Sequence, residues 1–366
     1  MRRIVLLVSA LTLLSACTPP LPPEVLAGQA EAKIDCATAV TKVSGPAEFA
    51  PAVEAIAGML IGVCPDHSIE YVPDDLSAEV EILDHTPSPA EVKAFTARCE
   101  SGTALVAPAF GMAATISLQV TGLEGLVLDA RAISGLIDGS IKSWDDQVIQ
   151  DLNPEFILDP VPVIRFVTND KSAAVLAITS WAKRDGDYAA KPSDVIRGDQ
   201  TFETVDELAA ELFNVEGAFG IVPLGTAVIN GLNTARLQVT KTDILTPEPV
   251  YTMRGIATTE LSENELGQLT ASVAFGGKVN ENLSDPLIDP ANFKSGWPAL
   301  GIGHVLACED SKDLGALPFA RFVVRGEGQG ALEGIGYTRL PLPIRLQSIL
   351  ALKTPLSEEL LEQIKN

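Results

Sequence analysis

Short runs of β-branched and apolar residues alternate along the chain with stretches whose apolar positions recur at helical spacing. The first series predicts strands at 37–43, 69–72, 79–83 and 103–119, with helices near 49–62 and 89–98. A second series predicts strands at 126–128, 161–167 and 219–222, with helices at 130–137, 172–184 and 205–213. Strands that alternate with helices are typical of an α/β fold with a mostly parallel sheet.

The apolar run 104–120 is long for a single strand, although Pro108 and Gly111 interrupt it. We therefore expect it to cross between two lobes, with the segment 299–307 returning beside it to complete a hinge. This assigns 34–110 together with 299–366 to the first lobe and 111–298 to the second. The stretch 260–298 is more irregular, and helices are predicted near 314–333, 342–352 and 356–365.

The N-terminus has the three parts of a secretory signal. Two arginines follow Met1, the apolar segment 4–14 comes next, and Leu14-Ser15-Ala16-Cys17 resembles the lipobox of bacterial lipoproteins. The apolar segment is shorter than the roughly 20 residues that span a bilayer as a helix. We therefore expect residues 1–16 to be removed, and the resemblance implies that Cys17 is lipidated.

A linker rich in proline, 17–33, follows the expected lipidation site, and proline at this density favours an extended spacer. These features predict an extracytoplasmic protein that is anchored to the bacterial cell membrane through Cys17.

Four further cysteines are an even number in a compartment where disulfides persist. Cys36 and Cys64 each precede a predicted strand, as expected for neighbouring parallel strands joined by a helix. Cys99 begins one strand-like run and Cys308 ends another, which suits an antiparallel pair. Three connectivities are possible, and we favour 36–64 with 99–308.

The composition is acidic, since 48 Asp and Glu residues outnumber 26 Lys and Arg residues and the formal net charge is −22. No cluster of basic residues offsets this charge, so nucleic acid is excluded as an expected partner. The Cys and His residues do not fall in CxxC, HxxxH or HExxH spacing, so we expect no metal site and no cofactor. Hydrophobic residues make up 46% of the chain, enough for a sizeable core.

Several segments resemble, in chain order, the motifs of the phosphate-binding proteins that serve ABC importers. The matching segments are 126–129, 133–146, 152–154, 217–222, 230–232 and 326–341. The first three resemble the family's "L.LD", "IF.G.I..W.D" and "LNP" motifs. The resemblance implies a two-lobed periplasmic-binding-protein-like α/β fold of the class II type, in which a small ligand lies between the lobes.

The same resemblance marks candidate ligand-binding residues in the first loop. Ser44, Gly45, Ala47, Glu48 and Phe49 are similar to the family's "G.GATF" loop, except that Glu48 stands where a threonine is usual. A carboxylate aimed at the pocket would repel phosphate unless it were protonated or turned away. Alternatively, the glutamate is simply a favourable acid in a first helical turn.

Two later loops add candidates. Asp84 resembles the family's acidic acceptor, but an aspartate before His-Thr-Pro is also ordinary turn chemistry. Asp170, Lys171 and Ser172 align with a loop in which the family has an arginine and two glycines. The flexible ammonium of Lys171 does not reproduce a guanidinium fork. The family's second loop has no recognisable counterpart at 72–77.

These features predict an extracytoplasmic solute-binding lipoprotein of an ABC importer, which binds phosphate or another small polar or anionic ligand. An ABC permease is then a possible partner. The degenerate loops leave an alternative open, a surface lipoprotein that uses the same fold as a scaffold or partner-binding module. We do not expect an enzyme, because there is no GxSxG motif and the three histidines lack a paired nucleophile motif.

Overall fold

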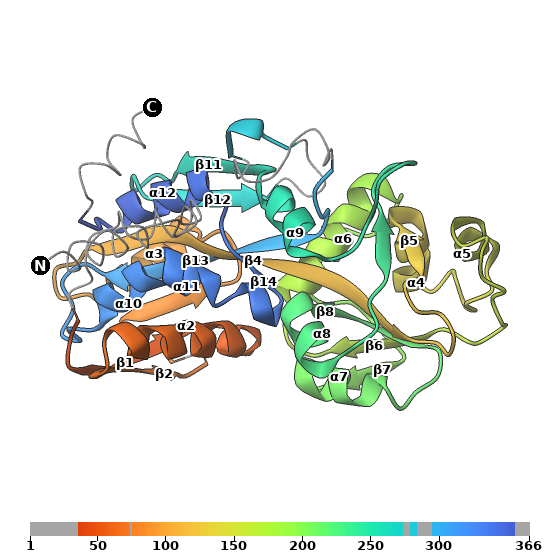
Figure 1. Cartoon of the computed structure of the whole chain (residues 1–366), viewed down its shortest axis with the longest axis horizontal. Coiled ribbons are helices and arrows are strands. Elements are labelled where there is room, and N and C mark those ends of the chain that lie inside the picture. The colour runs from red at the N-terminus through yellow and green to blue at the C-terminus, as the bar shows by residue number, and fades with distance from the viewer. Residues whose placement is uncertain (1–35, 74, 274–278, 284–294, 356–366) are drawn as a thin grey trace, which may run out of the picture. The chain divides into compact units, whose positions relative to one another are not determined.

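The computed structural model describes residues 36–73, 75–273, 279–283 and 295–355 (Figure 1). Residues 34–354 form one compact unit. The predicted signal peptide, the whole linker 17–33 with Cys17, and the predicted helix 356–365 lie outside the described residues. In the described part of the chain, no helix is long and apolar enough to cross a bilayer.

The main sheet is mixed, with the strand order β2-β1-β3-β13-β4-β8-β6-β7, and β14 also pairs with β4. Its strands are β1 (Ala39–Ser44), β2 (His67–Tyr71), β3 (Val80–Leu83), β4 (Ala104–Gln119), β6 (Ile164–Thr168), β7 (Gln200–Phe202), β8 (Ala218–Pro223), β13 (Leu300–Cys308) and β14 (Tyr337–Thr338). Strands β2, β1 and β3 are parallel, as are β8, β6 and β7. The centre of the sheet is antiparallel, because β13 and β8 both run opposite to β4.

Strand β4 joins the two parallel groups, and Figure 1 shows it running from one to the other. Residues 104–113 pair with β13, and residues 114–119 pair with β8, so the partner changes between Ala113 and Ala114. Nearly every residue of β4 is buried, which explains its continuous apolar sequence. Pro108 stays within the strand, and a register shift lies between Gly303 and His304 of β13, near the position where Pro108 is paired.

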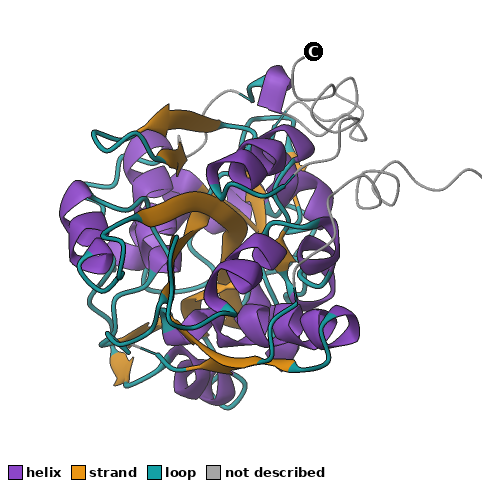
Figure 2. Cartoon of the chain, turned by 90° about the vertical axis from the view of Figure 1, so that its left-hand side faces the viewer, coloured by secondary structure: helices purple, strands orange, loops and turns teal. Residues whose placement is uncertain are grey.

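Helices lie on both sides of the strands (Figure 2). They are α2 (Ala50–Val63), α3 (Pro89–Thr96), α4 (Ala130–Asp138), α5 (Gln147–Leu152), α6 (Ala173–Asp185), α7 (Val205–Leu212), α8 (Leu224–Asn230), α9 (Pro249–Ile256), α10 (Ala316–Val323), α11 (Gly326–Gly330) and α12 (Leu342–Ala351). Short 3-10 helices are η1 (Ala47–Phe49), η2 (Glu281–Leu283) and η3 (Glu333–Ile335). Small strands are β5 (Val127–Asp129), β9 (Arg236–Gln238), β10 (Ile244–Leu245), β11 (Thr259–Glu263) and β12 (Leu269–Val273).

The predicted α/β class is confirmed, and most predicted elements are present within a few residues. Two predictions were wrong. The helix expected near 314–333 is two helices, α10 and α11, because the chain turns at Val324 and Arg325, and Arg325 is extended. The stretch 260–298 is not wholly irregular, since β11 and β12 form an antiparallel hairpin there.

The segment with the strongest family resemblance, 126–154, serves the fold. The Asn153 amide donates to Val127 O at 2.8 Å, and its oxygen accepts from Val127 N at 2.8 Å. The Trp144 indole is fully buried and donates to Gly217 O at 2.9 Å. These residues tie β5, α5 and the start of β8 together, so the motif identifies an architecture rather than a ligand.

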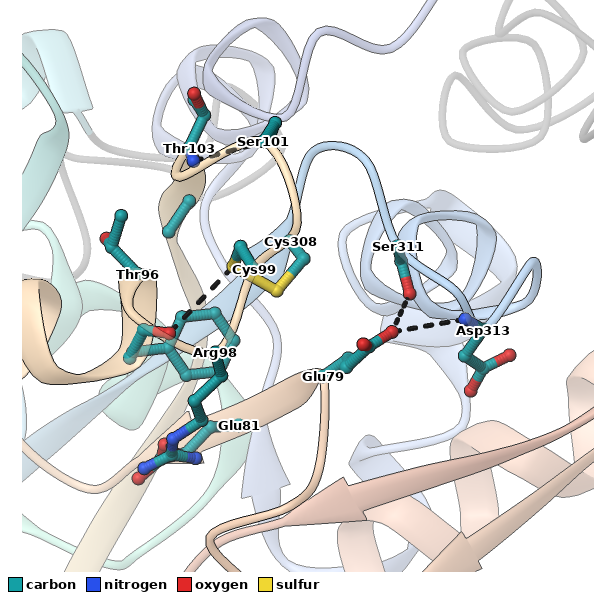
Figure 3. Close-up of a disulfide and its surroundings, with 12 residues drawn as sticks. Glu79, Glu81, Thr96, Arg98, Cys99, Ser101, Thr103, Cys308, Ser311 and Asp313 are labelled. Carbon is teal, nitrogen blue, oxygen red and sulfur yellow. Dashed lines mark hydrogen bonds and ion pairs between the residues drawn. A yellow bond between two sulfur atoms is a disulfide. The ribbon is translucent and has the colours of Figure 1, made fainter.

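Both favoured disulfides are confirmed, Cys36–Cys64 and Cys99–Cys308. The first links the beginning of β1 to the end of α2, and β1 and β2 are parallel as expected. Figure 3 shows the second, which joins the end of β13 to the loop after α3. In the same view Ser311 and the amide of Asp313 both donate to the Glu79 carboxylate.

Candidate functional site

The first candidate loop begins at the end of β1, where the backbone is closely packed. A Cβ added to Gly45 would lie 2.5 Å from Ile82 O and 2.8 Å from Tyr71 Oη, so only glycine fits there. The Tyr71 hydroxyl donates to Pro46 O at 2.6 Å. The Tyr337 hydroxyl donates to the backbone oxygen of Glu48. Two tyrosines from separate strands therefore fix the loop before α2 begins.

Phe49 and Ala47, both predicted as ligand-binding residues, have opposite surroundings. Phe49 is fully buried, and its ring packs edge-on against Phe110 at 5.0 Å and Tyr337 at 6.2 Å between centroids. Its side chain therefore belongs to the core. Ala47 is exposed, and Ser44, the last residue of β1, is buried.

Glu48 turns away from its own short helix and reaches the start of α6. Ser172, the N-cap of α6, donates through Oγ to Glu48 Oε2 at 3.4 Å and accepts from Ala174 N at 3.2 Å. Although Glu48 as a residue is partly exposed, its Oε1 atom is out of contact with solvent and has no hydrogen-bond partner among the described residues. The structure thus brings two predicted site residues together.

Burial, and to a smaller extent the nearby charge of Asp84, raise the pKa of the Glu48 carboxyl from 4.5 to about 8. Hydrogen bonds from the Ser172 hydroxyl and the Ala173 amide favour the charged carboxylate and so lower the pKa, but their effect is smaller than that of burial. Glu48 is therefore mostly protonated at neutral pH. A neutral acid at this place does not repel an anion as a carboxylate would.

Asp84 lies directly after β3 and pairs with its neighbour along the chain. Asp84 Oδ1 lies 2.6 Å from His85 Nδ1, and Glu91 Oε1 lies 2.8 Å from His85 Nε2. The hydrogen bond to Asp84 is the main reason that the pKa of His85 rises to about 9. Glu91 also completes the capping box of α3 with Ser88. Asp84 is thus engaged with an imidazolium, and its charge also acts on the Glu48 carboxyl.

Asp170 and Lys171 lie on the surface, before α6. The Lys171 side chain is 82% exposed, and its Nζ lies 3.7 Å from Asp194 Oδ2. Among the described residues, neither Asp170 nor Lys171 has a side-chain hydrogen bond or ion pair to Glu48. Asp170 and Lys171 precede Ser172 in the chain but do not share its contact with Glu48. Their assignment as ligand-binding residues stays a prediction.

Arg165, the nearest arginine before α6, is held elsewhere. Its guanidinium forms a fork with Asp199, with Nε 3.0 Å from Oδ2 and Nη2 2.9 Å from Oδ1. This pairing raises the pKa of Arg165 and lowers that of Asp199. Arg165 therefore does not stand in for the arginine that the resemblance implies at this loop.

A cavity of about 170 Å³ lies beside Glu48's neighbours Asp84 and Ala173. Of the residues that line it, only Asp84 was predicted as a site residue from the sequence. The lining residues are Asp84, His85, Thr86, Ala173, Leu176, Ala271, Ser272, Val273, Leu300, Gly301 and Ile302. At Gly301 an added Cβ would lie 3.6 Å from Asp84 O and 3.7 Å from the Ala173 Cβ. The lining from β12 comes from the stretch without a clear period, so no signal in the sequence could have placed it here.

Acidic and histidine side chains do not gather into a metal site in the part of the chain that the structure describes. His304 is buried, and its Nε2 accepts from Ala271 N at 2.9 Å. Burial lowers the pKa of His304 to about 4, so it is neutral and occupied by the backbone of β12.

No protein-family model matches the chain. Among curated proteins, phosphate-binding protein PstS 3 of Mycobacterium leprae is 24% identical over 341 residues, which cover 86% of this chain and 86% of that protein. PstS 3 of Mycobacterium tuberculosis is 28% identical over 142 residues, which cover 36% of this chain and 38% of that protein.

Solved structures give the same picture for the fold. A high affinity periplasmic phosphate-binding protein, PfluDING, bound with phosphate, has a TM-score of 0.61 at 14% identity and covers 84% of this chain and 92% of its own. A putative phosphate ABC transporter substrate-binding protein from Clostridium perfringens, with bound phosphate, has a TM-score of 0.53 at 12% identity and covers 82% of this chain and 99% of its own. The chain therefore has the fold of the two-lobed periplasmic phosphate-binding proteins.

Proposed function

We propose that this protein is an extracytoplasmic solute-binding lipoprotein that delivers a small polar ligand to an ABC permease. The fold that it shares with phosphate-binding proteins supports this function. Its predicted signal peptide and lipidation at Cys17 would hold it at the outer face of the cell membrane. The proposal includes no catalytic step, as expected for a binding protein of a transporter.

The observation that supports the proposal is the shared fold, and the hydrogen bond between Glu48 and Ser172 joins the two proposed lobes of that fold. Glu48 belongs to the proposed first lobe, 34–110 with 299–366, and Ser172 to the second, 111–298. β4 crosses between them, and its partner changes at Ala113 and Ala114. A ligand held at both ends of this contact would couple its own binding to the positions of the lobes.

Phosphate is the ligand that the relatives' names give, but the loops of this chain differ from those that the resemblance implies. Glu48 replaces a hydroxyl residue, and Lys171 faces Asp194 instead of Glu48. Each lost charged hydrogen bond would remove more than about 1 kcal/mol of phosphate binding. We therefore propose a small polar or anionic ligand, with phosphate binding weak in the wild type.

A hydroxyl, a histidine and an acid, the side chains of a catalytic triad, lie close together in the core of the protein. The Thr41 hydroxyl lies 3.0 Å from His67 Nε2 and 3.0 Å from Asp313 Oδ1. Thr41 and His67 are fully buried, so a substrate does not reach them. This cluster supports a structural role and gives no reason to propose catalysis.

Titration calorimetry of the mature chain tests the proposed function. Phosphate, sulfate, molybdate and a set of amino acids would be titrated separately, with a chloride salt as the control for ionic strength. Saturable heat from one of these solutes supports a solute-binding protein. The absence of binding heat with every one of these solutes would contradict the transport proposal.

The alternative is a surface lipoprotein that uses the fold as a scaffold or partner-binding module. The observation that favours it is that Glu48 itself fills the contact with Ser172. A pull-down from envelope membranes separates the two functions. Recovery of a permease supports transport, whereas recovery of other envelope proteins without a permease supports the scaffold.

A further inference from the structure

The helix α2 is apolar on its solvent side as well as on the side that packs in the core. The residues that it buries are Ala52, Val53, Ile56 and Leu60. On the solvent side, Met59, Ile61 and Val63 are 47%, 50% and 47% exposed. A surface helix normally carries polar residues on this side, but residues 55–63 include no polar or charged side chain. Water therefore faces an apolar helix surface here.

The exposed residues form one patch at the C-terminal end of α2. With about 3.6 residues per turn, Gly58 and Gly62 lie in line along the solvent side, with Met59 on one flank and Ile61 on the other. A Cβ added to either glycine would meet nothing within 4 Å among the described residues. We call Gly58, Met59, Ile61, Gly62 and Val63 the α2 patch. Single exposed apolar residues are ordinary, whereas a contiguous apolar patch marks a surface that binds another apolar surface.

The chain that leads to the predicted lipid anchor joins the protein beside this patch. Cys36 is the first described residue, and its disulfide holds its Cα 5.2 Å from that of Cys64. Cys64 is the C-cap of α2 and follows Val63 directly. The covalent path from Cys17 therefore reaches the folded unit at the end of α2 that bears the patch.

We infer that the α2 patch is a membrane-docking surface, which lies on the lipid bilayer to which Cys17 is anchored. The inference rests on the lipid anchor of the proposed function, but on neither its ligand nor its permease. The partner is the boundary between the headgroups and the acyl chains, which takes up apolar side chains from the exposed side of a helix.

The linker has the length that this docking needs. Cys36 lies 19 positions after Cys17, a reach of up to about 60 Å at about 3.1 Å per residue. Proline is dense only at 19–23, and the remainder contains Gly28 and no proline, so the linker need not hold the protein away from the bilayer. A short tether gives an effective concentration of about millimolar, so even a patch too small to bind a membrane by itself is sufficient.

The distribution of charge also favours this surface. The formal net charge of −22 opposes contact between the protein and an anionic bilayer. Residues 55–63 contain no acid, so the α2 patch approaches lipid headgroups without a carboxylate of its own. Glu54, the one charged residue of α2, lies before this stretch.

The test uses a tryptophan in the patch, introduced as Ile61→Trp in the chain 17–366. Cys17 is the one cysteine outside the two disulfides, so a maleimide lipid coupled to it supplies the anchor without cellular processing. The native tryptophans are buried and give a constant background; they are Trp144, Trp181 and Trp297. The matched control is Ile157→Trp, because Ile157 is 94% exposed and follows α5, which lies in the opposite half of the molecule from α2 (Figure 1).

The coupled chain is attached to vesicles of phosphatidylethanolamine and phosphatidylglycerol that contain brominated phosphatidylcholine. The brominated lipid should remove most of the fluorescence that Ile61→Trp adds, and the vesicles should protect this fluorescence from acrylamide in the buffer. Neither effect should occur for Ile157→Trp. Adding Met59→Asp to Ile61→Trp should restore most of the emission, because burying a carboxylate beside the acyl chains is costly.

The inference is overturned if the two tryptophan variants are quenched equally. It is also overturned if Ile61→Trp is not quenched while flotation shows that the chain is attached to the vesicles. Protection of Ile61→Trp from acrylamide without vesicles would overturn it too, because a second copy or a segment of this chain would then cover the patch. Membrane fractionation of Cys17→Ser tests cellular lipidation separately, so failure of the anchor and failure of the docking surface are distinguished.

Discussion

The hydroxyl of Ser172 donates to the carboxyl of Glu48 at 3.4 Å, across 124 residues of sequence. This single contact joins the loop after β1 to the first turn of α6. It brings together two of the residues that the sequence predicts to bind a ligand, and the buried Glu48 carboxyl has a raised pKa there. Titration or replacement of Glu48 should therefore change both the stability of the protein and its affinity for anions.

The first prediction concerns the pH dependence of stability. The pKa of Glu48 is about 8 in the folded protein against 4.5 ordinarily, so the folded state holds a proton that the unfolded state has lost. The stability from this group is fully present below pH 4.5 and is lost as pH rises through 8. The free energy of unfolding of the wild type should therefore decrease by a few kcal/mol over this range, because each unit of pKa shift corresponds to about 1.4 kcal/mol. Thermal melts at a series of pH values measure this decrease.

Glu48→Gln should flatten most of that fall, because the amide does not titrate. Glu54→Gln, an exposed acid on α2, is the matched control and should retain the wild-type profile. Parallel pH profiles for Glu48→Gln and the wild type would mean that Glu48 does not hold a proton in the folded state.

The second prediction concerns His85. Hydrogen bonds from its ring to Asp84 and Glu91 raise its pKa from 6.5 to about 9, so the stability they add is present below pH 6.5 and lost as pH rises through 9. Its ring protons should titrate near 9 by NMR, and Asp84→Asn should bring that value back toward 6.5. His67 and His304 titrate at lower pH, since burial lowers the pKa of both. A His85 resonance that titrates near 6.5 in the wild type would refute the pairing.

The third prediction compares the two disulfides. Cys36–Cys64 spans 28 residues and Cys99–Cys308 spans 209. The chain-entropy relation gives about 3.6 kcal/mol for the first and about 5.4 kcal/mol for the second. Replacing Cys99 and Cys308 by serine should therefore lower the free energy of unfolding by about 2 kcal/mol more than replacing Cys36 and Cys64.

Denaturant titrations of the two paired variants measure this difference, and peptide mapping without reductant should find all four cysteines oxidised. Exposure points to the order of reduction, because Cys36 is exposed whereas Cys99 and Cys308 are buried. Earlier reduction of Cys99–Cys308 under mild conditions would contradict this order.

The strands and the disulfide pairs could be predicted from the sequence, because local patterns determine them. The apolar run of β4 and the return of β13 could be predicted, since a buried strand is apolar on both faces. The disulfide pairs followed from where each cysteine stood relative to a strand. The break between α10 and α11 was missed, although Gly326, Gly328 and Gly330 follow it directly and could have marked it.

The candidate site was harder to predict, because its contacts are long-range. The loop residues Glu48 and Ser172 were both named, but their hydrogen bond depends on how β1 and α6 are placed in the sheet. The exposure of Lys171 and its approach to Asp194 depend on a loop 23 positions further along, which no local pattern positions. The cavity beside Asp84 was missed because β12 shows no clear alternation.

The fourth prediction concerns the N-terminus. Cys17→Ser removes the thiol that the lipobox resemblance assigns to acylation, so the protein should remain unprocessed or be released from the membrane. Membrane fractionation and intact mass measure both results, with Cys17→Ala as a second variant of the same kind. Unchanged fractionation and mass would contradict the predicted lipid anchor.

The claim that the altered loops weaken phosphate binding is tested most directly by calorimetric titration with phosphate. The titration compares the wild type with a variant that combines Glu48→Thr, Thr168→Arg and Lys171→Gly. The triple variant restores the hydroxyl, the guanidinium and the close backbone approach that the family resemblance implies, and a thermal melt confirms that it folds. We predict weak or absent binding by the wild type and saturable binding by the triple variant. Tight binding of phosphate by the wild type would contradict the claim.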